Sequence, residues 1–200
     1  MQPYPQQPYG QPLPPKKSSW PVWLVVIVVL LVAGVFGIGI FAAISIYGVR
    51  RYLAAAKTAE AKNTIGAIAR GAAASWERET ADAGAPHKLC GSAVTVPATV
   101  PKATKYNPLS SGGDFDTGDA ENGWKCLRFS MVQPIYYQYS YKQGSGYQAT
   151  SVSPGPTGFE ASARGDINGD GTTSLFALTG RPTPTGVDVS RTVYIENEFE

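Results

Sequence analysis

The residues of this chain that are best arranged to bind a ligand lie in the segment DINGDG, which begins at Asp166. Asp166, Asn168 and Asp170 alternate along it, and Gly171 is its sixth residue. An EF-hand calcium loop has this spacing, but it also needs a bidentate glutamate at its twelfth position, which is Ala177 here. Asn-Gly-Asp-Gly equally fits a hairpin turn. The segment therefore predicts either a metal-free turn or a weak calcium site of near-millimolar affinity.

Two further features have residue types that could form a site. The segment DFDTGDAEN carries Asp114, Asp116 and Asp119, which predict a looser calcium site or a solvated loop. His87 is the one histidine of the chain. A general base must come within hydrogen-bonding reach of its substrate, and the sequence sets no nucleophile motif or glycine-rich phosphate loop beside His87. We therefore expect an exposed His87, no enzymatic activity and no cofactor beyond weakly bound calcium.

Two cysteines, Cys90 and Cys126, lie in the C-terminal three quarters of the chain. A cysteine pair in a small β-rich domain is typical of an exported disulfide. A reduced pair is the alternative, and the spacing fits neither a zinc site nor a Cys-x-x-Cys motif. The pair predicts a disulfide and an extracytoplasmic domain.

Charge is distributed unevenly along the chain. Of the 17 Lys and Arg residues, Lys16 and Lys17 alone precede residue 50, and all 15 Asp and Glu residues follow it. The part after residue 49 is therefore formally neutral. Nucleic-acid binding needs clustered basic residues, so we expect no nucleic-acid partner.

The chain that carries these residues begins with a tail, residues 1–20. Its Pro/Gln/Tyr-rich composition predicts disorder. The span Val22–Tyr47 then runs 26 residues without a charge. At 1.5 Å per residue it makes roughly 39 Å of helix, enough to cross a membrane with tilt. Residues 21–48 are predicted as a transmembrane helix, and lipid as a partner.

Small residues recur in this helix as Ala33 with Gly37 and Gly39 with Ala43. Such pairs allow helices to approach in lipid and predict self-association, although glycine is common in membrane helices generally. Basic residues flank both ends of the span and favour, weakly, an orientation opposite to the one that the cysteines indicate. We follow the cysteines and expect a cytoplasmic N-terminus.

After residue 49 a helical pattern continues to residue 82. Lys57 and Glu60 are expected to pair on its polar surface. One continuous helix from near Pro21 to near Ala81 is predicted. The apolar stripe assigned to it consists of Tyr52, Ala56, Ala59, Ile65, Ile68, Ala72 and Trp76.

The rest of the domain 49–200 divides into two parts. Residues 83–123 are rich in turn-forming residues and are predicted to be irregular and tied down by the disulfide. Residues 124–200 are predicted as an antiparallel sheet, so the fold class is α+β. QGSG is expected as a turn between strands, and Trp124 as a core residue. The predicted strands are WKCLRFSM, IYYQYSYKQ, YQATSVS, FEASARGDI, TSLFALTG and RTVYIENEF.

The segment that joins the apolar run to the amphipathic helix after it resembles the N-terminal helix of type IV pilins and type II secretion pseudopilins. Its sequence is FAAISIYGVRRYLAAAKTAEAKNTIGAIARGAAASWE. Two later segments are similar to sheet segments of fimbrial-type proteins: GWKCLRFSMVQPIYYQYSY and FEASARGDINGDGTTSLFALTG. The resemblance covers residues 38–180. It implies one helix that is both membrane anchor and spine, packed on a four-stranded antiparallel sheet.

The chain departs from the pilin pattern at the prepilin cleavage site. In those proteins a basic leader ends in Gly-Phe, and a glutamate follows four residues later. Here the glutamate position falls on Leu30 and the cleavage point precedes Val26, within an unbroken apolar run; the usual helix-kinking proline falls on Tyr47. A membrane carboxylate that sets subunit register is thus missing. We expect Met1–Lys17 to stay attached on the cytoplasmic side.

These observations predict a single-pass, pilin-like structural or interaction protein of the bacterial inner membrane, with its C-terminal domain in the periplasm. It would act in a fimbrial or secretion-type assembly, with itself or secretion-system proteins as partners. The alternative is a membrane-anchored module that never polymerises and captures an extracellular ligand or ion.

Overall fold

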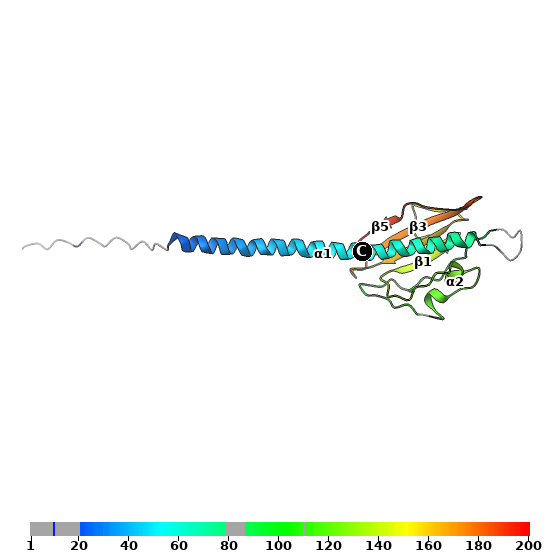
Figure 1. The fold of residues 1–200 in the computed structure, drawn as a ribbon, viewed down its shortest axis with the longest axis horizontal. Helices are drawn as coiled ribbons and strands as arrows, with labels where there is room; N and C mark the ends of the chain where they lie inside the picture. The colour runs from blue at the N-terminus through cyan, green and yellow to red at the C-terminus, as the bar shows by residue number, and fades with distance from the viewer. Residues whose placement is uncertain (1–9, 11–20, 79–86, 110) are drawn as a thin grey trace, which may run out of the picture. The chain divides into compact units, whose positions relative to one another are not determined.

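The computed structural model describes residues 10, 21–78, 87–109 and 111–200, so nearly all of the predicted tail lies outside the described residues. The fold is α+β, as predicted (Figure 1). Its helices are α1 (Val22–Trp76), the short 3-10 helix η1 (Asp114–Asp116) and α2 (Gly123–Leu127). Its strands are β1 (Gln138–Gln143), β2 (Phe159–Gly165), β3 (Ser174–Thr183), β4 (Gly186–Val189) and β5 (Tyr194–Glu196). The chain forms two compact units, Met1–Val49 and Arg50–Glu200.

In the first unit, α1 is long and apolar enough to cross a membrane. Its large apolar side chains are exposed, among them Val35 at 70 % and Phe41 at 74 %. Exposed apolar area of this extent is unfavourable in water and favourable in a hydrocarbon layer. The segment is therefore consistent with a single-pass membrane protein.

The second unit contains a five-stranded antiparallel sheet, one strand more than the pilin resemblance implies. The strand order is β1-β2-β3-β4, and β5 also pairs with β3. Strand β3 is long enough to hold both: its last residues pair with β4, while Leu175–Ala177 pair with β5. In the register of the sheet, Tyr139 lies opposite Ala163, which lies opposite Phe176.

The later turns of α1 pack on one face of this sheet (Figure 1). Ile65, Ile68 and Ala72 have no exposed surface, which confirms the second half of the predicted stripe. Alternate residues of β1, β2 and β3, with the residue just before β1, face the same core. They are Tyr137, Tyr139, Tyr141, Phe159, Ala161, Ala163, Phe176 and Leu178.

The first half of the predicted stripe is wrong. Tyr52 is 75 % exposed, and Ala56 and Ala59 are exposed as well. The step from Ala59 to Ile65 is six residues, and at about 100° per residue this turns the helix face about 120° away from the earlier positions. The buried face of α1 instead begins at Thr58.

Trp124 is fully buried, as predicted, whereas Trp76 is partly buried at the edge of the core. The strand predicted at WKCLRFSM is wrong, because residues 123–127 form α2. Arg128 ends this helix in the left-handed conformation at φ 50°, and its N–H bonds the Lys125 carbonyl. The ring of Trp124 packs edge-on against Phe115 at 5.0 Å, which favours the compact turn over an extended strand.

The strand predicted at YQATSVS is also wrong. QGSG ends β1, but the connection to β2 runs through residues 144–158 rather than a tight hairpin. Glu160, which has no exposed surface, accepts N–H bonds from Gln148 at 2.8 Å and Ala149 at 2.9 Å and so holds this connection on the sheet. Strand β4 was not predicted, because Pro182 and Pro184 shortly before it argue against a strand.

The segment predicted to be irregular, as far as the structure describes it, forms isolated bridges beside β1. Val96 bridges Tyr139 on the free edge of β1, and Tyr106 bridges Ile135, which precedes β1. A covered edge does not recruit a foreign strand, so this segment protects the sheet on that side.

The close approach of α1 to α2 gives the first prediction. A Cβ added at Gly71 would lie 2.6 Å from the Leu127 carbonyl oxygen, whereas one at Gly66 would meet only the Arg70 side chain at 3.5 Å. Gly66→Ala should therefore stabilise the protein by about 0.5–1 kcal/mol through helix propensity. Gly71→Ala should lower stability instead, because the backbone of α2 must move. Thermal unfolding of the two detergent-solubilised variants checks this, and equal shifts of the same sign would contradict it.

Candidate functional site

The DINGDG segment forms the turn between β2 and β3. The Asp166 side chain is buried, and its two carboxylate oxygens accept the N–H groups of Gly169 at 2.7 Å and Gly171 at 3.1 Å. Both glycines have positive φ, 82° and 95°, which explains why glycine is needed at these two places. Asp166 therefore acts as the internal anchor of the turn.

Asn168 and Asp170 close the same turn from outside. Asn168 Oδ1 accepts the Asp170 N–H at 2.8 Å, and Asp170 Oδ1 accepts the Thr172 N–H at 2.7 Å. The Thr172 N–H bond lowers the pKa of Asp170 below its ordinary value. The Asn168 amide also donates to Asp170 Oδ2 at 3.0 Å. The structure thus brings the three predicted residues together, with their oxygens occupied by N–H donors of the turn.

The second acidic segment is organised differently. The Asp114 carboxylate accepts the Tyr106 hydroxyl at 3.0 Å and the Leu109 N–H at 2.6 Å. Asp116 accepts the Gly112 N–H at 2.8 Å. Asp119 accepts the Glu121 and Asn122 N–H groups, which lower its pKa. Each carboxylate serves its own turn, and within the described residues no three His, Cys, Asp or Glu side chains gather as a metal site.

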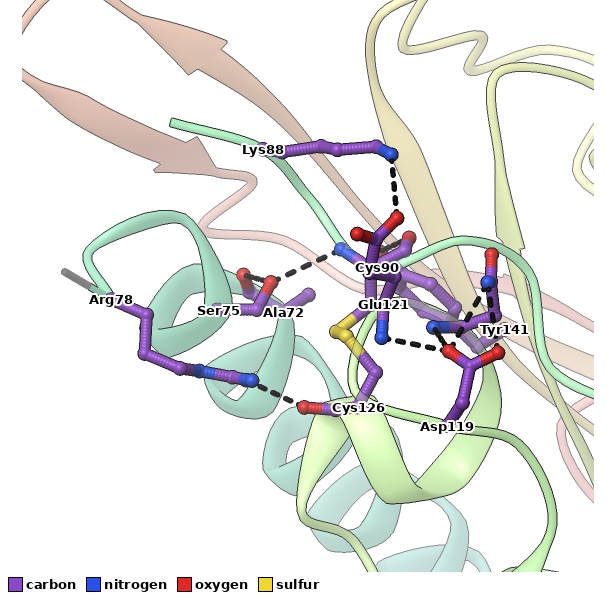
Figure 2. Close-up of a disulfide and its surroundings, with 10 residues drawn as sticks. Ala72, Ser75, Arg78, Lys88, Cys90, Asp119, Glu121, Cys126 and Tyr141 are labelled. Atoms are coloured by element: carbon purple, nitrogen blue, oxygen red, sulfur yellow. Dashed lines mark hydrogen bonds and ion pairs between the residues drawn. A yellow bond between two sulfur atoms is a disulfide. The ribbon is translucent and has the colours of Figure 1, made fainter. Parts of the chain in front are cut away.

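Cys90 and Cys126 form a disulfide, as predicted (Figure 2). It joins the segment after α1 to α2, and not to a sheet strand as expected, because Cys126 lies in α2. The surroundings hold both ends: Ser75 Oγ accepts the Cys90 N–H at 3.2 Å, and Arg78 donates to the Cys126 carbonyl at 2.5 Å. Figure 2 shows these two residues of the α1 end beside the bridge.

His87 is exposed, as expected, but it borders a groove that the sequence did not reveal. The His87 ring lies 5.8 Å from the Trp76 ring in a stacked arrangement, and Nδ1 lies 2.7 Å from the Trp76 carbonyl oxygen. The groove has a volume of about 530 Å³. Its lining includes Trp76, His87, Gln143, Pro156, Pro182 and Pro184.

A polar contact between α1 and the sheet was also missed. Glu60, expected on the solvent face with Lys57, instead accepts the Tyr136 N–H at 3.0 Å and the Tyr139 hydroxyl at 3.2 Å. Burial raises the pKa of Tyr139, so its hydroxyl stays protonated and can donate. Alternating inward tyrosines on β1 were the available indication, since a buried phenol needs an acceptor.

Comparison with known proteins gives no match: no family model, no curated protein and no solved structure matches this chain. Inferences about its function therefore rest on its own residues.

The disulfide gives the second prediction. Replacing both cysteines with serine frees a loop with a sequence separation of 36, which in the chain-entropy model lowers the free energy of unfolding by about 4 kcal/mol. Urea unfolding of the solubilised protein measures the loss. A midpoint and slope equal to those of the wild type would contradict the prediction.

The turn gives the third prediction. Asp166→Ala should destabilise by about 1–3 kcal/mol, because it leaves two N–H groups without their acceptor. Asp170→Ala should cost less, because Asp170 lies on the exposed side of the turn and bonds one backbone N–H.

Calcium tests the two interpretations of the same turn. Micromolar calcium should leave the melting temperature of wild type and both variants unchanged, and any response should be confined to millimolar calcium. At ten times the dissociation constant, binding would add about 1.4 kcal/mol. A steep rise of the wild-type melting temperature at micromolar calcium would contradict the weak-site interpretation.

Proposed function

We propose that this chain is a single-pass protein of the bacterial cell envelope whose pilin-like domain acts by protein–protein interaction in a fimbrial or secretion-type assembly. The observation that carries the proposal is the double use of α1. Its apolar part is able to cross a membrane, and its later turns supply Ile65, Ile68 and Ala72 to the core of the folded domain. Type IV pilins and pseudopilins combine the same two roles in one helix.

The proposed topology has a cytoplasmic N-terminus in the inner membrane and a periplasmic second unit. The Cys90–Cys126 disulfide supports it, since such bonds form and persist in oxidising compartments. The proposal does not need a cleaved leader, because the anchor is the uncleaved helix.

Self-association through α1 is the proposed route to assembly. At about 100° per residue, Ala33 and Gly37 share one face of the helix, and Gly39 and Ala43 share a second face about 120° away from the first. A Cβ built on Gly37 or Gly39 meets nothing within 4 Å, so both faces are open to a neighbouring helix. Two separate faces allow each helix two neighbours, as a polymer requires.

A second candidate is a binding module that never polymerises. The groove beside Trp76 and His87 favours it, because a concave surface of about 530 Å³ with aromatic, proline and amide groups is of the kind that holds small ligands.

Cross-linking in native membranes, followed by intact mass of the extracted protein, gives the fourth prediction. Wild type should cross-link to itself or to other envelope proteins, and its monomer should have the mass of the full chain. Gly37→Leu/Gly39→Leu should reduce self-cross-linking severalfold by closing both helix faces. Ile38→Leu, a volume-conserving change between the two faces, is the control.

Two results would count against these proposals. A monomer without cross-linked partners would contradict the assembly and favour the binding module. A mature N-terminus between Val22 and Gly39 would contradict the uncleaved anchor.

A further inference from the structure

The end of the second unit that follows the apolar run in sequence carries a group of basic side chains, which we call the basic end: Arg50, Arg51, Lys57, Lys102 and Lys105. Arg50 and Lys57 line the same hollow, of about 270 Å³, together with Phe199. The Arg51 guanidinium lies 5.8 Å from the centre of the Phe199 ring.

The two other lysines reach this end from the irregular segment. The ammonium groups of Lys57 and Lys105 lie 4.4 Å and 4.8 Å from the centre of the Tyr136 ring. The backbone of Lys102 forms an isolated β-bridge with that of Asp166 at the adjacent turn. Residues from α1 and from residues 102–105 are thus brought to one surface.

The acidic groups near the basic end have hydrogen-bond or ion-pair partners other than the five basic residues. Asp166 bonds two N–H groups of its turn, Glu60 bonds Tyr136 and Tyr139, and Glu198 pairs with Lys62 at 2.6 Å. Glu200 and Asp170 both bond the Asn168 amide. The ion pairs found in the described part of the chain involve none of the five basic residues.

The positions of Arg50 and Arg51 match the depth of lipid headgroups, and the Lys57 backbone lies a few ångströms beyond it, within reach of its long side chain. Arg50 follows directly on the apolar run, and Lys57 comes seven residues later, about 10 Å along the helix. Headgroup regions extend several ångströms beyond each side of the roughly 30 Å hydrocarbon core. Cations over aromatic rings with no paired carboxylate are well placed to meet phosphate anions there.

We propose that the basic end binds the phosphate headgroups of anionic glycerophospholipids in the leaflet next to residue 50. This proposal rests on the membrane assignment of α1 and is independent of whether the chain polymerises.

The test uses the full chain in nanodiscs that contain phosphatidylcholine and phosphatidylglycerol in equal amounts. Native mass spectrometry of the released protein gives the ratio of the two lipids that remain bound. The variant that tests the basic end, called the base variant because it neutralises basic residues, is Arg50→Gln/Arg51→Gln/Lys57→Gln. The matched control, Arg70→Gln/Arg181→Gln/Arg191→Gln, removes three exposed positive charges from other parts of the same unit.

Wild type and control should retain more phosphatidylglycerol than phosphatidylcholine. In the base variant the ratio of bound phosphatidylglycerol to phosphatidylcholine should fall at least tenfold, because each basic residue near an anionic surface contributes a factor of about five. The excess should also fall as salt is raised. Circular dichroism checks that each variant is folded. If the base variant does not fold, Lys102→Gln/Lys105→Gln takes its place, with a smaller loss expected.

Equal retention of the two lipids by wild type would overturn the proposal and leave these charges to an acidic protein partner. The same excess in wild type and in the folded base variant would overturn it as well, because the preference would then come from elsewhere in the chain.

Discussion

The structure of the second unit depends on burying one face of α1 against the tyrosine-lined face of the sheet. Ile65, Ile68 and Ala72 have no exposed surface there, and the Tyr139 hydroxyl donates a hydrogen bond to Glu60 of the helix. A sheet with one apolar face must be covered, and an amphipathic helix must find such a cover. Because the covering helix is continuous with the apolar run, the same packing that stabilises the domain also ties it to its anchor.

The segment between α1 and the sheet is held by specific bonds rather than by regular structure. The disulfide fixes it to α2, Tyr141 donates its hydroxyl to the Cys90 carbonyl, and Val96 bridges β1. These contacts also cover the edge of β1, which would otherwise offer unpaired backbone groups to other chains. Removing the disulfide would therefore loosen both the packing of α2 and the protection of the sheet edge.

Buried carboxylates in this protein hold loops in place. Asp166 and Glu160 are each nearly inaccessible, and each accepts two backbone N–H groups of a neighbouring loop. A buried carboxylate is unfavourable unless it is bonded in this way, and the bonds in turn fix the loop. Acidic residues with ligand-like spacing can thus be explained by the turn they stabilise.

The sequence by itself determined the long helix, its apolar part, the α+β class and the cysteine pair, because local periodicity, length and composition decide these. It misplaced Tyr52, Ala56 and Ala59 and the strand at Cys126, and it missed the Glu60 contact and the groove at Trp76. Only the tertiary structure decided these, because they depend on which side of α1 meets the sheet and on which distant loops meet. Two sets of apolar residues that are separated by six residues look like one continuous stripe in the sequence. On the helix they lie about 120° apart, so only one of them faces the core.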